Sequence, residues 1–228
     1  MTAYFSDKSF RFLRALARNN TRAWFQAHKH DYDTHVRGPF LQLVTDLQPA
    51  LREVSEHYRA DPKPVGGSLF RLHRDTRFAN DKTPYKRWQG ARLFHARGRQ
   101  VEAPSFYIHL EPGECFVGAG LWHPEPVTQR ALRQFIFDNP GSWKAAAHAP
   151  AFRRRYDLES EQKLVRPPRG FPADFEFIED LKHRNFVAVR ALDDAVFTGP
   201  RLRQELQKDL RALAPFVDYL CAALDLEF

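Results

Sequence analysis

Apolar residues recur every three or four positions near both ends of the chain, which is the spacing of an amphipathic helix. Ser6 or Asp7 can cap the first of these segments, and Thr21 can cap the second. Helices are predicted from 7 to about 19, from 21 through Phe25, over about 39–58, over 125–138, near 175–181 and over about 198–224. The two ends of the chain are therefore expected to be helical.

In the middle of the chain the apolar period changes to two, which is typical of β-strands. Strands are predicted over 68–73, 91–96, 105–111 and 114–121, with a further edge strand over 186–189. Pro112 and Gly113 separate two of these runs and predict a tight hairpin, with Glu111 and Glu114 exposed beside the turn. Short strands joined by tight turns favour an antiparallel sheet. We expect residues 1–228 to form one α+β domain, with a mostly antiparallel sheet from the middle of the chain packed against N- and C-terminal helices.

Composition supports a folded core and argues against a membrane protein. Apolar residues make up 43% of the 228 positions, and 20 of them are Phe. No run approaches the ~18 consecutive apolar residues of a membrane span, and the first residues lack the pattern of a signal peptide. Cys115 and Cys221 each lie in an apolar run, so we expect two buried thiols rather than a disulfide or a metal site. A cytoplasmic location with no membrane partner is expected.

The net charge of +7 is concentrated in one part of the chain. Residues 61–110 carry ten Lys or Arg and four Asp or Glu, so nearly all the excess lies in this segment. The loop 71–87 is its most basic part and contains the turn formers Asn80 and Pro84. Such a concentration can act as a local field.

This basic loop has the chemistry of an anion site. Guanidinium forks at Arg74 and Arg77 match phosphate or carboxylate oxygens, Asp75 can orient an arginine, and Tyr85 or Asp81 can exchange a proton. The candidate binding residues in the loop are Arg71, Arg74, Asp75, Arg77, Lys82, Tyr85 and Lys86. The loop therefore predicts an anionic small-molecule ligand, and catalysis is possible but not specified.

Three other interpretations of the loop stay open. Asp75 and Asp81 can pair with arginines and staple the loop, with Phe78 and Tyr85 packed beneath it. Alternatively, the basic residues interleaved with aromatic ones, Trp88 among them, suit a nucleic-acid-binding strip. A non-catalytic interaction protein is the third interpretation, in which the stapled loop is purely structural.

A second candidate site lies on a predicted strand. Tyr107 and His109 project from the same strand face, and Gly118 and Gly120 lie on the strand paired with it through the hairpin. Glycines there leave room for a ligand, so Tyr107 and His109 are further candidate binding residues, and His109 is a third candidate for proton transfer. The alternative is a half-buried structural histidine beside a packed tyrosine.

Motifs for established chemistries are missing from the sequence. No nucleophile elbow or Walker loop occurs, and Gly118-x-Gly120 lacks the strand–turn–helix context of a nucleotide fingerprint. His28, Asp31 and His35 share a helical face without a fourth ligand, which favours a solvated polar face. No metal or cofactor is predicted.

A string of residues along the chain carries a resemblance to a known family. The string includes Phe10-Arg-Phe-Leu, Asn19-Asn20, Trp24-Phe25, Phe70-Arg71, Arg74-Asp75-x-Arg77-Phe78, Asp81-Lys82-Thr83-Pro84-Tyr85-Lys86, Tyr107-x-His109, Gly118-Ala-Gly120, Arg133, Pro168-Arg-Gly170 and Leu181-Lys182. It resembles the bacterial family catalogued as domain of unknown function 2461 over nearly the whole chain. The resemblance implies an α+β domain and supplies no activity, cofactor or catalytic residue.

Overall fold

A six-stranded antiparallel sheet forms the centre of the molecule. The computed structural model describes residues 3–77 and 79–228, and in this part of the chain the strands run in the order β1-β2-β3-β4-β6-β5. Their bounds are β1 Tyr58–Arg59, β2 Gln89–His95, β3 Ser105–Leu110, β4 Phe116–Leu121, β5 Asp157–Leu158 and β6 Phe186–Ala191. The predicted hairpin is present, because β3 pairs with β4 in the register Ser105 to Gly120.

Helices precede and follow this sheet, so the predicted α+β class is confirmed. Before the sheet lie α1 Asp7–Arg18, α2 Arg22–Ala27, α3 Lys29–Tyr32, the π-helical turn η1 Asp33–Arg37 and α4 Gly38–Val54. Between β4 and β6 lie α5 Pro126–Asp138, α6 Pro140–Ala147, α7 Pro150–Arg153 and α8 Ile178–Leu181, and after β6 lie α9 Asp194–Thr198 and α10 Leu202–Ala222.

The first two helices begin where their capping residues predict. The Ser6 hydroxyl accepts a hydrogen bond from an amide of the first turn, and the Ser6 amide donates one to the Ser9 hydroxyl. Thr21 accepts from the amide of Trp24 at the start of α2. These bonds satisfy backbone donors that have no partner within the helix itself.

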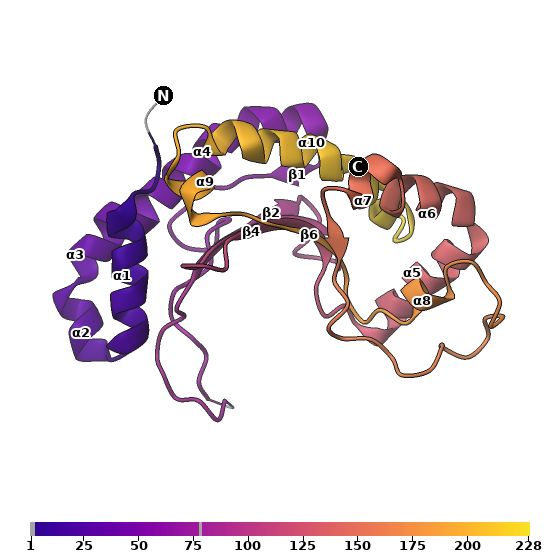
Figure 1. The fold of residues 1–228 in the computed structure, drawn as a ribbon, viewed down its shortest axis with the longest axis horizontal. Helices are drawn as coiled ribbons and strands as arrows, with labels where there is room; N and C mark the ends of the chain where they lie inside the picture. The colour runs from indigo at the N-terminus through magenta and orange to yellow at the C-terminus, as the bar shows by residue number, and fades with distance from the viewer. Residues whose placement is uncertain (1–2, 78) are drawn as a thin grey trace.

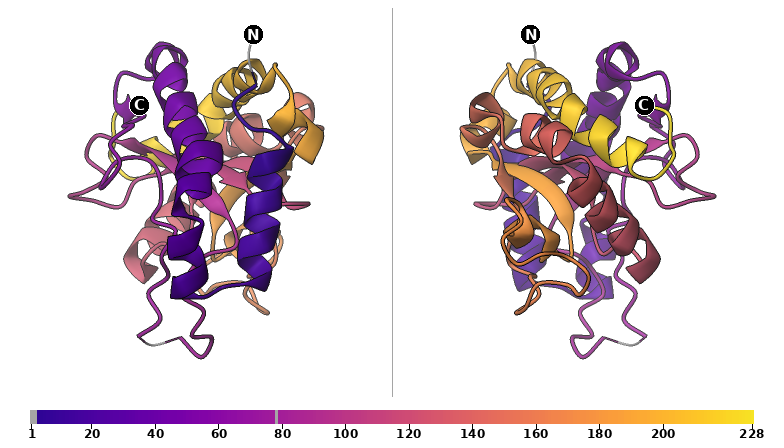
Figure 2. Two further views of the ribbon diagram at one scale, coloured as in Figure 1. Left: turned by 90° about the vertical axis from the view of Figure 1, so that its left-hand side faces the viewer. Right: turned by 90° about the vertical axis from the view of Figure 1, so that its right-hand side faces the viewer.

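One face of the sheet packs against helices, and the side chains of each strand alternate between that face and the opposite one. In β3, Phe106, Ile108 and Leu110 are almost fully buried on the side where α4 and α10 pack. Figures 1 and 2 show these two helices lying together over that face. Ser105, Tyr107 and His109 alternate with the buried residues and therefore lie on the other face.

A buried carboxylate ties the helix layer to the sheet. Asp209 of α10 is fully buried and accepts hydrogen bonds from Arg155, Arg190 of β6 and the Tyr156 hydroxyl. A buried charge is tolerated only when its oxygens are paired in this way. Cys115 and Cys221 are buried free thiols, as predicted.

Three details of the predicted secondary structure are wrong. The segment 186–189 was expected to be an edge strand, yet β6 lies between β4 and the two-residue β5, which covers its outer side. The segment 68–73 forms only isolated bridges instead of a strand. The helix predicted to reach residue 58 ends at Val54, because the chain turns there into the short strand β1.

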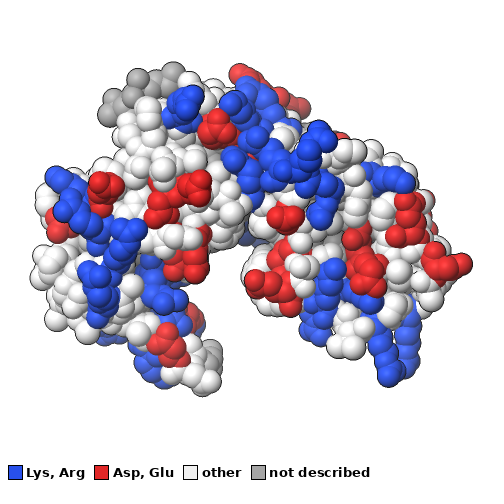
Figure 3. All heavy atoms as spheres, viewed as in Figure 1, with Lys and Arg blue, Asp and Glu red and all other residues white. Residues whose placement is uncertain are grey.

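Helices also lie at both sides of the sheet, and the sheet face opposite α4 and α10 is left open between them. In Figure 1, α1 to α3 form one flank, α5 to α8 form the other, and the segment 71–87 hangs from the sheet beside the first flank. The space-filling view shows a hollow between the two flanks, with both basic and acidic side chains on each side of it (Figure 3). Among the described residues, no helix has both the length and the apolar character required to cross a bilayer.

Candidate functional site

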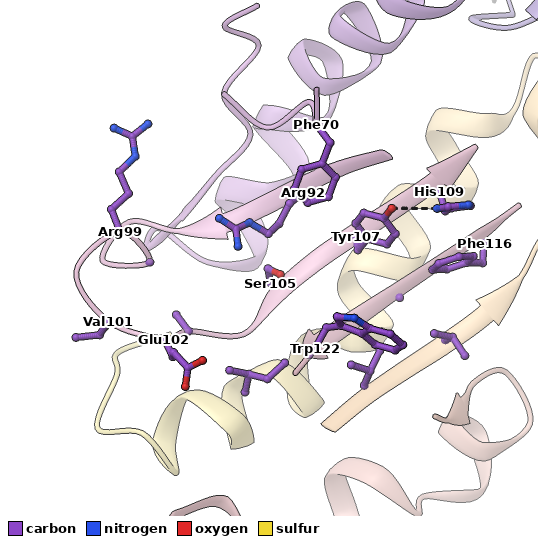
Figure 4. Close-up of a pocket in the computed structure, with 18 of the residues that line it drawn as sticks. Phe70, Arg92, Arg99, Val101, Glu102, Ser105, Tyr107, His109, Phe116 and Trp122 are labelled. Atoms are coloured by element: carbon purple, nitrogen blue, oxygen red, sulfur yellow. Dashed lines mark hydrogen bonds between the residues drawn. The ribbon is translucent and has the colours of Figure 1, made fainter. Parts of the chain in front are cut away.

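A cavity of about 790 Å³ lies against the open face of the sheet. Its walls come from β2, β3, β4 and β6 and from the loop between β2 and β3 (Figure 4). Five aromatic rings line it: Phe70, Trp88, Tyr107, Phe116 and Trp122. The volume and the predominance of apolar rings are typical of a small-molecule pocket.

Three side chains of the β3 segment form a hydrogen-bonded chain at one end of this cavity. The Tyr107 hydroxyl lies 2.9 Å from Nδ1 of His109, and Nε2 of His109 lies 3.0 Å from Oε2 of Glu111. A carboxylate can only accept, so Nε2 carries the imidazole proton and Nδ1 accepts the phenol proton. We refer to Tyr107, His109 and Glu111 as the Tyr–His–Glu relay.

Burial controls the charge of this relay. His109 is only 7% exposed and stacks on Phe116, with ring centroids 4.5 Å apart and an interplanar angle of 14°. Burial lowers the pKa of His109, and the hydrogen bond to Glu111 opposes that shift only in part. Burial also raises the pKa of Tyr107. At neutral pH the relay therefore holds a neutral phenol and a neutral imidazole.

Glycines on the neighbouring strands are required by close contacts. A Cβ atom at Gly90 would lie 2.3 Å from the Tyr107 hydroxyl oxygen, so the phenol occupies the space above this glycine. Gly120 has a φ of +134°, and a Cβ there would lie 1.9 Å from the carbonyl oxygen of Phe186. At Gly118 the clash would be with the carbonyl oxygen of Ala188, at 2.6 Å. Gly118 and Gly120 line the cavity, but glycine is required at both positions because the backbone of β6 lies too close for a Cβ atom.

Arg92 supplies a positive charge on the cavity wall. It is the cross-strand neighbour of Tyr107, on the same sheet face, and its side chain is exposed. Over residues 3–77 and 79–228, no hydrogen bond or ion pair engages its guanidinium group. Figure 4 places Arg92 and Arg99 toward one end of the cavity and His109 toward the other. Arg99 donates to the carbonyl oxygen of Gly66 at 2.9 Å.

Lys86 adds a further cation beside the same cavity. Its ammonium group lies 4.6 Å from the centroid of the Trp88 ring and 5.2 Å from that of Phe70, both of which are wall residues. Such distances are those of cation–π contacts. Burial lowers the pKa of Lys86.

The segment 71–87 is here called the basic arm, and its described residues, 71–77 and 79–87, form the two sides of a long irregular hairpin. Its two sides are joined by the bridge between His73 and Tyr85 and by a hydrogen bond from the Lys86 amide to the carbonyl of Leu72. The Asn20 side chain fixes the base of the arm, since it bonds both the amide and the carbonyl of Tyr85, at 3.0 and 2.9 Å. The arm is therefore anchored to the N-terminal helices.

Most predicted anion contacts in the basic arm have partners inside the arm. Arg74 bonds Asp81 and Thr83, Arg77 pairs with Asp75 at 2.7 Å, and Lys82 donates to the carbonyl of Thr76 at 3.0 Å. The pairing of both acids with arginines is what the stapled-loop alternative expects. Arg71 is exposed. Arg71, Arg74, Asp75, Arg77, Lys82 and Lys86 are not wall residues of the cavity over the sheet.

Two candidates for proton transfer lie away from the cavity. Tyr85 is 1% exposed, and its ring stacks on Phe25 with centroids 4.3 Å apart. Asp81 is exposed, and hydrogen bonds from the Thr83 amide and from Arg74 lower its pKa to about 2, which leaves a weak base. Phe78, expected beneath the arm, lies outside the described residues. The third candidate, His109, belongs to the Tyr–His–Glu relay.

A family model described as conserved hypothetical protein (DUF2461) matches residues 8–219. The chain belongs to this family. The resemblance found in the sequence is thereby confirmed. No curated protein and no solved structure matches the chain. The DUF2461 description names no reaction, so function has to be argued from the geometry of this member.

In this DUF2461 protein, Arg92 and Glu111 are site residues that sequence reasoning missed. Glu111 was expected to be exposed beside the hairpin turn, yet its side chain is 17% exposed and bonded to His109. The alternation of side chains along a strand could have indicated this, because Glu111 follows Tyr107 and His109 at the same two-residue spacing and therefore lies on their face. Across the described residues of the chain, no group of three His, Cys, Asp or Glu side chains is placed to hold a metal ion.

Proposed function

We propose that this DUF2461 protein binds a small anionic molecule with a flat or apolar body in the cavity over the open sheet face. The proposal rests on one observation: a cation, Arg92, lies on the wall of an aromatic cavity with no bonding partner in the described residues. A guanidinium in that position favours a carboxylate or phosphate. The anionic ligand is the one the sequence predicts, with its main contact moved from the basic arm to the sheet.

The aromatic wall supports a flat or apolar ligand body. Tyr107 and Phe116 have ring centroids 5.5 Å apart, and Phe70 lies 5.8 Å from Tyr107, so the rings form a continuous surface. Burying apolar area against it contributes about 25 cal/mol for each Å² removed from water. Lys86, held over Trp88 and Phe70, adds positive potential on the same side.

The test is thermal stabilisation by small anions. Benzoate, phenyl phosphate and adenosine monophosphate, each at 10 mM, are compared with uncharged benzyl alcohol. Saturation at 100 times the Kd stabilises the folded state by about 2.7 kcal/mol, so a real site gives a clear rise in Tm. We expect at least one of the anions to raise the Tm and benzyl alcohol to leave it unchanged.

Three arginine variants locate the site. Arg92→Ala should abolish the stabilisation by the anion. Arg71→Ala is the matched control, since Arg71 is also exposed but lies off the cavity wall, and it should retain the effect. Arg74→Ala tests the basic arm. If Arg74→Ala abolishes binding and Arg92→Ala does not, the anion site belongs to the arm and the sheet-face proposal is wrong.

A binding test on the same protein distinguishes a nucleic-acid-binding function from a small-molecule one. If no small anion stabilises it but a single-stranded oligonucleotide binds with an affinity that falls steeply with salt, the small-molecule proposal is overturned.

A further inference from the structure

We propose that the Tyr–His–Glu relay makes Tyr107 the proton-transferring residue of the cavity, acting on an anionic ligand that carries an exchangeable O–H group. The inference rests on the proposed function, because it assigns chemistry to the same cavity. It assigns proton transfer, and not binding alone, to that cavity.

The direction of the hydrogen bonds determines what the relay does. Glu111 accepts from Nε2 of His109, which leaves Nδ1 as an acceptor facing the Tyr107 phenol at 2.9 Å. This is the arrangement in which a carboxylate orients an imidazole and the imidazole removes a proton from an oxygen. Tyr107 and His109 both line the cavity, but both ring nitrogens of His109 are bonded within the relay, so the Tyr107 oxygen is the relay atom left to meet a ligand.

The proposed step is a double proton transfer. The ligand O–H bond breaks as its proton moves to Oη of Tyr107, and the original phenol proton moves to Nδ1 of His109. The ligand is left as an oxyanion and the imidazole as a cation, which Glu111 stabilises. Return of the two protons restores the starting state, and no oxidant, reductant or further reactant is needed.

The surroundings of His109 keep its imidazole ready to act as a base. Trp88 lies 4.9 Å from its ring centroid and Phe116 stacks on it at 4.5 Å, so two aromatic rings limit contact with water. The charged groups that face it are Glu111 and Glu114, which raise its pKa, while burial lowers the pKa by more. Lys86 is the cation held over Trp88.

Reaction with a sulfonyl fluoride tests the relay without knowledge of the natural ligand. With benzenesulfonyl fluoride, Oη of Tyr107 forms a bond to sulfur, the S–F bond breaks, fluoride leaves, and the phenol proton passes to His109. Peptide mass spectrometry measures the rate at each of the seven tyrosines. General-base assistance is worth ~100-fold or more, so Tyr107 should react fastest. Tyr107→Phe should remove that label.

Two variants and a pH profile separate a base from a packing residue. His109→Phe keeps an aromatic ring beside Phe116 but removes the base, and it should slow labelling of Tyr107 by ~100-fold. Glu111→Gln should slow it less.

In the unaltered protein the rate of Tyr107 labelling should stay flat from pH 7 to 9, because His109 is already neutral there. In His109→Phe it should rise about tenfold per pH unit with the phenolate fraction.

The outcomes distinguish the relay from the binding site. Labelling of Tyr107 no faster than that of other tyrosines, or a rate in the unaltered protein that climbs with pH, would overturn the relay even if anions stabilise the protein. Fast, His109-dependent labelling supports the relay, and an anion that raises the Tm should slow it by occupying the cavity. If labelling is fast but no anion binds, the relay stands and the proposed anionic ligand is wrong.

Discussion

The basic arm and the open sheet face differ in how their charges are satisfied. The arm carries most of the cations that make the sequence conspicuous, yet Arg74 and Arg77 are each paired with an aspartate of the same arm. The sheet face carries fewer charges, and Arg92 there has no partner in the part of the chain that the structure describes. The density of charge in a sequence is thus a poor measure of the charge available to a ligand.

Local geometry explains the difference. In an irregular segment, residues two positions apart can face each other, as Asp75 and Arg77 do. In a strand, residues two positions apart share a face, and the two such neighbours of Arg92 are Gly90 and Phe94, which carry no charge. Its cross-strand neighbour is Tyr107, which carries no charge at neutral pH. Arg92 therefore has no acidic side chain at the neighbouring same-face positions of its own strand, nor directly across from it on β3.

The largest expected effect is on the free energy of unfolding, when a glycine of the sheet is replaced. Gly120→Ala should destabilise the protein by about 3–5 kcal/mol, because the new Cβ meets a backbone oxygen at 1.9 Å and the φ of +134° disfavours any side chain. Chemical denaturation measures the loss. Gly141→Ala is the matched control, since no atom lies within 4 Å of its Cβ, and it should be neutral or slightly stabilising. Equal losses in both variants would contradict the tight packing of β4 against β6.

A smaller effect is expected at the base of the arm. Asn20→Ala removes both side-chain bonds to the Tyr85 backbone and should cost about 1–3 kcal/mol. Hydrogen exchange at the Tyr85 amide should quicken, which reports loosening of the arm itself. Asn80→Ala, at an exposed position, should leave both measurements unchanged. An unchanged Tyr85 exchange rate in Asn20→Ala would show that the arm is held by other contacts.

At the outer part of the arm, no measurable stability effect is expected. The pair between Arg77 and Asp75 is exposed to water, where ion pairs contribute little. Arg77→Ala should leave the Tm unchanged in calorimetry. A clear fall in Tm would mean that the contacts of Arg77 hold the arm in place.

The smallest effect is a change in one titration. Asp81 has a folded pKa of about 2, below its ordinary value of 3.8, so the stability it contributes is complete above about pH 4 and is lost as the pH falls toward 2. The Thr83 amide is the first cause and Arg74 the second. Arg74→Ala should therefore raise the pKa of Asp81 only part of the way to 3.8, as followed by carboxyl NMR. A complete return to 3.8 would assign the whole shift to Arg74.

Much of the fold could be predicted from the sequence, because it depends on local patterns. Capping at Ser6 and Thr21 and the turn at Pro112-Gly113 use residues close together in the chain. The interior position of β6 could not be predicted, since it depends on pairing with distant β4. For the candidate site, too, the local features could be predicted and the non-local ones could not. Parity along one strand placed Tyr107 and His109 on a common face, whereas the cavity around them needs four strands and a loop.

The alternation of β3 has a consequence for how this protein can diversify. Even-numbered positions from 106 to 110 build the hydrophobic interior, and odd-numbered positions from 105 to 111 meet the cavity or its relay. Point substitutions at odd positions can change the surface of the cavity without disturbing the interior. Inserting or deleting one residue in this strand would exchange the two sets and lose both at once. Variation among relatives of this chain should therefore consist of replacements in β3, with length changes confined to its flanking loops.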